Sequence, residues 1–145
     1  MDRGVYALVF KNRSCSLRIG SLGEIHFRGG WHVYIGSARG TGGFARVRRH
    51  RRLALSRDRP ATWHVDHLLL SPAFILRHVI CGSTEEDLEC ALALALGGRH
   101  IPSFGSGDCS CGSHLVYRLS DPHGEVVEAM SSLGLVPMSA TIKKE

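Results

Sequence analysis

The sequence predicts a single α+β domain in which a small antiparallel or mixed β-sheet is flanked by helices. Short runs rich in Val, Tyr and Phe, which favour strands, come first in the chain. The apolar spacing typical of helices begins only at Gly42. Strands that precede helices favour α+β over a doubly wound sheet. The 145 residues suit one domain over 1–145, with neither an internal repeat nor a linker.

In the first half of the chain the pattern predicts three strands and then two helices. The expected strands are Gly4–Phe10, Ser16–Ile19 and Trp31–Ile35. A helix is expected between Gly42 and Pro60, because Phe44, Val47, Ala54 and Leu55 fall on one stripe. A second, short helix is expected over Thr62–Leu70, closed by Ser71-Pro72.

The second half alternates between strands and helices. Ser83 or Thr84, with Glu86 or Asp87 three residues later, forms a capping-box pattern that predicts a helix start. The expected elements are a strand over Ala73–Cys81, a helix over Glu85–Leu96, a loop over Ile101–Gly112, a strand over Leu115–Leu119 and a helix over Glu125–Leu133. The Lys143–Glu145 end is expected to fray.

Basic residues dominate the charge and gather in one segment. The formal net charge is +5 and the pI is near 9.2, which favours polyanionic partners, DNA or RNA. Asp58 is the only acid between Arg46 and Arg59. We therefore expect a sequence-independent contact with the phosphate backbone, the alternative being a solvated helix face. The arginines concerned are Arg48, Arg49, Arg51, Arg52, Arg57 and Arg59.

Composition also predicts the setting. Apolar runs are far shorter than the roughly 20 residues of a membrane-spanning helix, and the start of the chain lacks a signal-peptide pattern. Five cysteines form no even disulfide framework, so reduced thiols are expected. Together these features predict a cytoplasmic protein with no membrane contact.

Two tripeptides place a tyrosine beside a glycine, in Gly4-Val5-Tyr6 and Tyr34-Ile35-Gly36. Hydroxyl groups, a backbone that admits close approach and nearby guanidinium groups suit a site that handles phosphodiesters. In their order, these tripeptides, Arg46 on the following helix and Glu89 on a later one resemble the GIY-YIG nuclease superfamily.

Within that superfamily the sequence is most similar to a small family of unknown function that is sometimes fused to endonuclease-III-type DNA glycosylases. The similarity covers about residues 4 to 118, and a terminal helix and tail, 119–145, follow. It is carried by Val33–Ala38, Arg49-His50, Trp63–Asp66, Phe104–Cys111 and Ser113–Leu115. The resemblance implies a Mg²⁺- or Mn²⁺-dependent DNA endonuclease and a DNA-repair protein as a partner.

The resemblance also implies roles for individual residues. Glu89 would bind one metal ion, Tyr6 and Tyr34 would position or deprotonate the attacking water, and Arg46 would hold a phosphate oxygen. Independently of the resemblance, His50 lies four residues after Arg46, hence on the same helix face, and its titration near neutral pH predicts that it shuttles a proton or donates to a phosphate. The alternatives are a solvated carboxylate at Glu89 and two tyrosines that pack in the core.

Further residues are candidates for the rim or support of the site. Asp66 is expected to orient His64, the alternative being that Trp63 is a core anchor and His64 a structural histidine. Cys109, Cys111 and His114 give three of the four ligands that structural zinc requires, so zinc is not expected. The glycine-rich loop with Asp108 is expected to shape the site rim instead.

Two departures from the superfamily pattern bear on function. The segment between Tyr6 and Tyr34 is longer than in compact nucleases, which predicts an extra strand or turn between the tripeptides. The asparagine that usually closes the site has no counterpart, because the Asp108-Cys109 loop stands in its place. The alternative function is therefore a non-catalytic nucleic-acid-binding module on a nuclease scaffold.

Overall fold

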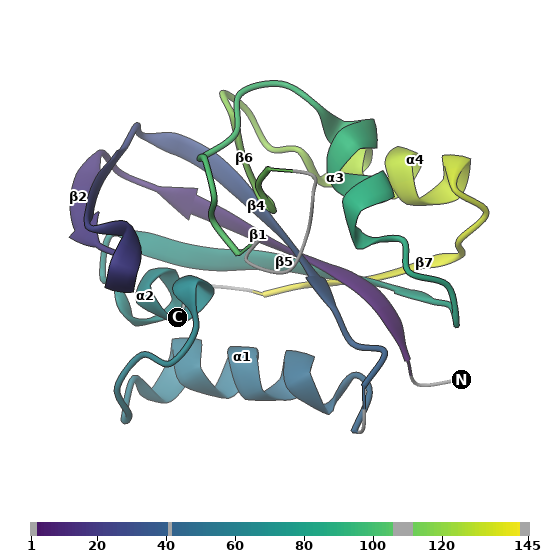
Figure 1. The fold of residues 1–145 in the computed structure, drawn as a ribbon, viewed down its shortest axis with the longest axis horizontal. Coiled ribbons are helices and arrows are strands. Elements are labelled where there is room, and N and C mark those ends of the chain that lie inside the picture. Colours follow the sequence, from purple (N-terminus) through teal and green to yellow (C-terminus); the bar gives the residue numbers. More distant parts are fainter. Residues whose placement is uncertain (1–2, 41, 106–111, 143–145) are drawn as a thin grey trace.

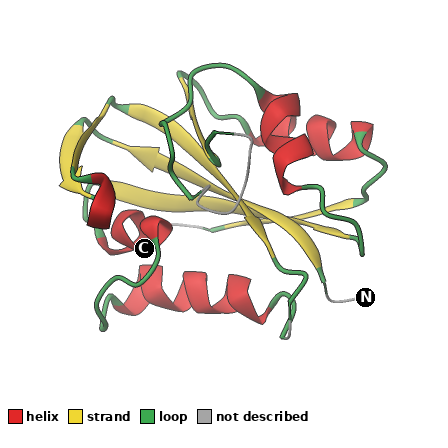
Figure 2. Cartoon of the chain, in the orientation of Figure 1, coloured by secondary structure: helices red, strands yellow, loops and turns green. Residues whose placement is uncertain are grey.

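The computed structural model describes residues 3–40, 42–105 and 112–142. The fold is α+β, as predicted, with a five-stranded antiparallel sheet that has helices on both faces (Figures 1 and 2). The strands are β1 (Gly4–Asn12), β2 (Cys15–Arg18), β3 (Glu24–Phe27), β4 (Gly30–Ser37), β5 (Phe74–Ser83), β6 (Leu115–Arg118) and β7 (Pro137–Thr141). The described helices are η1 (Gly20–Leu22), α1 (Ala45–Ser56), α2 (His64–Leu70), α3 (Glu89–Leu96) and α4 (His123–Ser132).

Strand β1 is the centre of the sheet, whose order is β6-β4-β1-β5-β7. Successive side chains of a strand point to opposite faces, and β1 is apolar on both. Tyr6, Leu8 and Phe10 belong to one buried cluster, together with residues of α1 and α2. Val5, Ala7 and Val9 belong to the other, together with residues of α3 and α4. The sheet is therefore the middle layer of three, with α1 and α2 on one side and α3 and α4 on the other (Figure 1).

A separate two-stranded sheet, β2 paired with β3, lies between β1 and β4 in sequence. It accounts for the extra length between Tyr6 and Tyr34. The predicted extra strand or turn is therefore a whole hairpin, of which the sequence indicated only the β2 strand, with the 3₁₀ turn η1 at its tip. The insertion leaves β1 and β4 directly paired, with Tyr6 opposite Gly36.

Several element boundaries differ from those that the sequence predicts. Helix α3 begins at Glu89, because the Thr84 hydroxyl accepts the Glu86 N–H (3.0 Å) in a turn and does not cap a helix there. Strands β3 and β7 were not expected. The latter is an exposed edge strand that begins with proline and lacks apolar alternation.

The loop predicted over Ile101–Gly112 and the frayed tail at Lys143–Glu145 lie partly or wholly outside the described residues. Those of the loop that are described, 101–105 and 112, are in neither helix nor strand. In the part of the chain that is described, no helix is both long and apolar enough to cross a bilayer.

Candidate active site

Six of the predicted site residues line one cleft of about 440 Å³, and four of them are the residues predicted to carry out the chemistry. Tyr6 comes from β1, Tyr34 from β4, Arg46 from α1 and Glu89 from the start of α3. The fold thus brings a late carboxylate to two early phenol groups and a guanidinium. The rest of the wall is formed by Ser37, Thr62, Trp63, His64, Gly105 and His114.

The two tyrosines are neighbours on adjacent strands. Their ring centroids are 6.4 Å apart. The Tyr6 ring is almost completely buried, and its hydroxyl oxygen lies 2.8 Å from Nε2 of His50. Both rings also pack in the core beneath α1, so the core role and the site role coincide.

Gly36 is required by this arrangement. A Cβ atom at this position would lie 2.3 Å from Cζ of Tyr6 and 2.4 Å from its hydroxyl oxygen. Real Cβ atoms do not approach other heavy atoms so closely. The glycine of the second tripeptide therefore makes room for the tyrosine of the first. With a larger residue at position 36, β1 and β4 could not pair with the Tyr6 ring in its present place.

The tyrosines are neutral at physiological pH. Burial raises the pKa of Tyr6 well above its usual value and that of Tyr34 to about 12. Arg46 lowers both pKa values, but burial outweighs it. The two phenol groups are consequently hydrogen-bond donors and acceptors in the cleft, better suited to positioning a water molecule than to deprotonating it.

Arg46 reaches the cleft from the first turn of α1. Its Nη1 donates a hydrogen bond to the carbonyl oxygen of Ser37 (2.9 Å), and its Cζ lies 5.0 Å from the ring centroid of Trp63. No described carboxylate forms an ion pair with it. The guanidinium keeps donors available for a phosphate oxygen.

His50 does not share the exposed position of Arg46, although the two residues lie one helical turn apart. It is completely buried behind the cleft wall, where its Nε2 meets the Tyr6 hydroxyl and its ring packs edge-on against the indole of Trp63 (centroids 5.8 Å apart). Burial lowers its pKa to about 4. The expectation that His50 titrates near neutral pH is therefore wrong, and it is a positioning residue for Tyr6.

Glu89 is the first residue of α3 and is half-buried. Its Oε2 lies 3.9 Å from Nδ1 of His114. Burial, and next the nearby Asp87, raise the pKa of Glu89, whereas Arg39 and Arg46 lower it. A bound cation would favour the ionised carboxylate, so the environment suits a metal ligand better than an isolated charge.

The oxygen atoms of the cleft fit a Mg²⁺ or Mn²⁺ ion that keeps most of its water ligands. Among residues 3–40, 42–105 and 112–142, no three His, Cys, Asp or Glu side chains gather closely enough to hold a metal ion. Mg²⁺ commonly needs only one or two protein carboxylates, with water and substrate phosphate supplying the other oxygens. Glu89, in a polar cleft beside two hydroxyl groups, provides that minimum.

His64 lines the cleft, but the group that orients its ring is not the expected Asp66. The backbone N–H of Gly105 donates to Nδ1 of His64 (2.9 Å). Burial, and next His67, lower the pKa of His64, which keeps the ring neutral. The proton then resides on Nε2, so this histidine offers a hydrogen-bond donor from the wall of the cleft.

Asp66 does not orient His64, so this expectation is wrong. Its carboxylate is fully buried and accepts the backbone N–H groups of Thr62 (2.9 Å) and Trp63 (3.0 Å) at the start of α2. It also pairs with both terminal nitrogens of Arg49, each at 3.2 Å. Burial alone would raise the pKa of Asp66, but these hydrogen bonds lower it.

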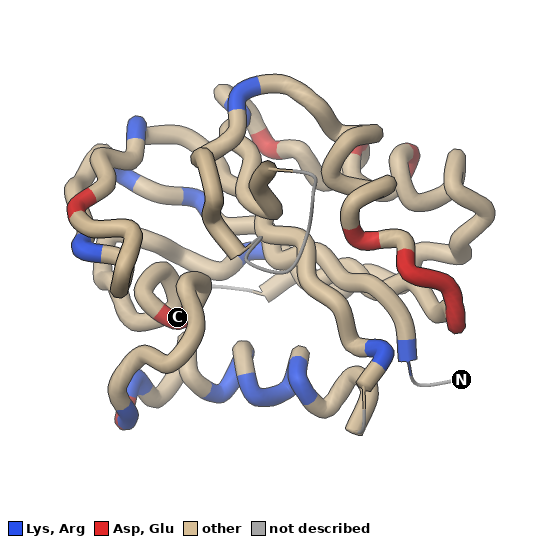
Figure 3. The backbone as a smooth tube through the Cα atoms, viewed as in Figure 1, with Lys and Arg blue, Asp and Glu red and all other residues tan. Residues whose placement is uncertain are grey.

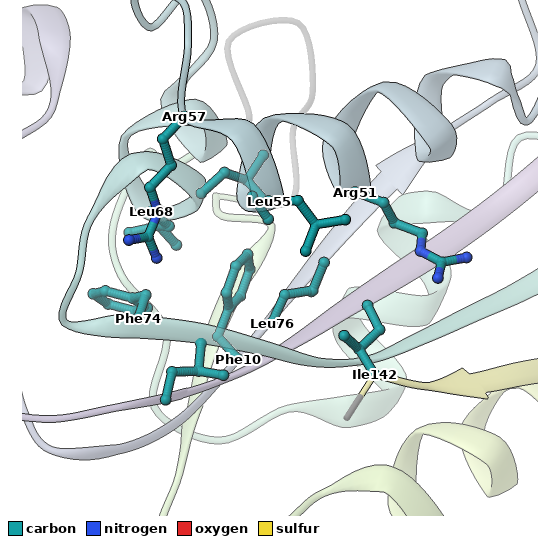
Figure 4. Close-up of a pocket in the computed structure, with 11 residues that line it drawn as sticks. Phe10, Arg51, Leu55, Arg57, Leu68, Phe74, Leu76 and Ile142 are labelled. Carbon is teal, nitrogen blue, oxygen red and sulfur yellow. The ribbon is translucent and has the colours of Figure 1, made fainter. Parts of the chain in front are cut away.

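The arginines predicted to bind the phosphate backbone fall into different environments, although α1 as a whole is basic (Figure 3). Arg49 is held by Asp66. Arg51 and Arg57 border a largely apolar cavity of about 320 Å³ between α1, α2 and β5, which contains none of the cleft residues (Figure 4). Nε of Arg59 lies 3.8 Å from Oδ1 of Asp58, so these two side chains form an ion pair. The remaining two, Arg48 and Arg52, are exposed and in no ion pair with a described residue.

The late loop is described only in part. Asp108, Cys109 and Cys111 lie outside the described residues. His114 is buried at the wall of the cleft, and its Nε2 lies 3.7 Å from Sγ of Cys90. Cys90 is disulfide-bonded, whereas Cys15 and Cys81 are free. The expectation that all the thiols are reduced is therefore wrong for Cys90.

Four residues of the cleft wall, Ser37, Thr62, Trp63 and Gly105, were not predicted individually as participants. Ser37 contributes its backbone carbonyl and Gly105 its backbone N–H, and neither leaves a side-chain signal in the sequence. Trp63 was weighed as a core anchor, but 40% of its surface is exposed. An aromatic residue directly before a candidate site histidine was the available signal.

The chain is similar to one family of known sequences. The model of the domain of unknown function DUF123 matches residues 5–135, so the chain belongs to the DUF123 family. No curated protein and no solved structure matches it.

Proposed function

We propose that this protein is a metal-dependent DNA endonuclease of the GIY-YIG kind, acting in DNA repair. The observation that carries the proposal is the convergence of Glu89, Tyr6, Tyr34 and Arg46 on one polar cleft. The resemblance of the two tripeptides to that superfamily supports it, as does the basic helix α1 beside the cleft.

The donors of the cleft suit a phosphodiester. Arg46 and the Nε2–H of His64 bind its non-bridging oxygens, where negative charge accumulates during hydrolysis. The hydroxyls of Tyr6 and Tyr34 align the attacking water, and His50 holds the Tyr6 hydroxyl in place. A Mg²⁺ or Mn²⁺ ion held by Glu89 would supply charge neutralisation and help for the leaving oxygen.

Cleavage assays test this proposal. Wild type is expected to cut at least one of plasmid, branched and single-stranded DNA when Mg²⁺ or Mn²⁺ is added. Glu89→Ala should lose about 100-fold or more of the rate, because it removes the only carboxylate that the described residues contribute to the cleft wall. Glu86→Ala, an exposed acid just before α3, is the matched control and should cut normally. Wild type and Glu89→Ala that are equally inert on every substrate would contradict the proposal.

The second candidate is a module that binds nucleic acid without cutting it. The observation that favours it is the raised pKa of both cleft tyrosines, which leaves no phenolate at neutral pH. This candidate predicts salt-dependent binding that survives Glu89→Ala and weakens in an Arg48→Ala/Arg52→Ala double variant, with no cleavage under any condition.

A further inference from the structure

Trp63 is an exposed aromatic residue in the wall of the cleft, and its position is fixed. Its backbone N–H is held by the Asp66 carboxylate (3.0 Å), and the same carboxylate holds Arg49. Cζ of Arg49 lies 4.2 Å from the indole centroid. One buried acid thus anchors both the residue and the cation against which its ring packs.

The cation–π and ring contacts of Trp63 with described residues come from one helix. Arg46, Arg49 and His50 contact the indole, and all three belong to α1. With these contacts made, 40% of the surface of Trp63 is still exposed. Among the described residues, Trp63 is the one aromatic side chain in the set of exposed large hydrophobic residues, whereas Trp31, Tyr34 and Phe44 are only partly exposed.

A flat aromatic surface beside a phosphate-binding arginine has a defined chemical partner. Aromatic side chains bind unpaired nucleobases by stacking, while neighbouring cations bind the backbone. Arg46 connects the two functions, because it lines the cleft and lies 5.0 Å from the indole centroid. Bases within a duplex are already stacked and are not available to such a surface.

We infer that Trp63 stacks on an unpaired nucleobase adjacent to the phosphate in the cleft, so that the substrate is single-stranded or locally unpaired nucleic acid. This inference rests on the proposed function for its substrate class. Its test uses binding and not cleavage, so that the two can fail separately.

Fluorescence gives a direct readout. The chain has two tryptophans, and Trp31 lies outside the cleft, stacked on His78. In a Trp31→Phe variant, Trp63 is therefore the only tryptophan. In EDTA, a short oligothymidylate is expected to quench its fluorescence, whereas an oligomer of the same length without bases should not.

Affinity provides the second arm. Trp63→Ala should weaken oligothymidylate binding about ten-fold or more, and Trp63→Phe should recover most of the loss. Binding of the abasic oligomer and of a blunt duplex should not change. A ribo-oligomer in the same assay distinguishes RNA from DNA as the source of the base.

Equal affinity of wild type and Trp63→Ala for oligothymidylate, with no quenching in the Trp31→Phe variant, would overturn the inference. Equal loss of affinity for the base-containing and abasic oligomers would also overturn it, because the effect would then be electrostatic. If the stacking result holds while wild type and Glu89→Ala are equally inert in every cleavage assay, the endonuclease proposal fails and the stacking site stands.

Discussion

At the scale of single residues, the close contact between Gly36 and Tyr6 links the two tripeptides. We expect Gly36→Ala to destabilise the fold by about 1–3 kcal/mol, as overpacking does, because the added Cβ would meet the Tyr6 ring at 2.3 Å. Cleavage should fall as well, because the ring can accept the methyl group only by leaving its place beside His50. Urea denaturation measures the first effect.

Gly40→Ala is the control for this substitution. Gly40 is exposed, and a Cβ there would meet nothing within 4 Å. Its free energy of unfolding should stay close to that of wild type. If Gly36→Ala proves as stable and as active as Gly40→Ala, the close packing of Tyr6 against β4 does not constrain the site.

Part of the candidate site could be predicted from residue types and their order in the sequence. The rest depends on burial and on contacts between elements, which the sequence does not show. The neighbours Tyr6, Tyr34 and Glu89 could be chosen from the sequence because their order resembles a known pattern. The neutral state of His50 could not, since it follows from complete burial beneath Tyr6. The partnership of Asp66 with Arg49 could not either, because it depends on how α1 and α2 pack together.

At the scale of elements, the arginines of helix α1 have two kinds of environment. Arg49 is paired with the buried Asp66, whereas Arg52 is exposed and is proposed to contact DNA. We expect Arg49→Ala to destabilise the protein by about 2 kcal/mol or more, because it leaves the buried carboxylate of Asp66 without its charged partner. Arg52→Ala should leave stability within about 0.5 kcal/mol and weaken DNA binding, since Arg52 is exposed and pairs with no described acid.

Thermal unfolding and DNA titrations at two salt concentrations separate these effects. Arg49→Lys is the stricter version of the first variant, because lysine keeps the charge but cannot make the two parallel bonds to Asp66. A fully stable Arg49→Ala protein would contradict the supporting role assigned to this arginine.

The elements that the sequence predicted are those with strong local patterns. Strand β1 was expected because its run of Val, Tyr and Phe favours a strand, and helix α1 because its apolar residues have helical spacing. Strand β7 was not, since it lies at the sheet edge with mostly exposed residues and is held by pairing with β5. The start of α3 was misplaced by four residues, because Thr84 forms a local turn that resembles a helix cap in sequence.

At the scale of the whole molecule, buried neutral histidines make stability depend on pH. His32 and His50 are completely buried, and burial lowers the pKa of each to about 4. In the unfolded chain a histidine has a pKa near 6.5, so between about pH 6.5 and pH 4 the unfolded state binds more protons. The free energy of unfolding should therefore fall as the pH falls through this window, by up to about 3 kcal/mol for each of the two.

Denaturation with urea at several pH values measures this dependence. His32→Phe should flatten the slope by up to one proton, or about 1.4 kcal/mol per pH unit. His100→Gln, at an exposed position, should leave the slope unchanged. A stability that is constant from pH 6.5 to pH 4 would show that neither ring stays neutral in the folded protein.

We propose that the carboxylate of Glu89 binds a divalent metal ion beside the hydroxyls of Tyr6 and Tyr34. Electron paramagnetic resonance of Mn²⁺ titrated into the protein with bound DNA tests this proposal. We predict one Mn²⁺ site for each chain that Mg²⁺ displaces, that is lost in Glu89→Gln and that persists in Glu86→Gln. A Glu89→Gln protein that binds Mn²⁺ as tightly as wild type would contradict the account.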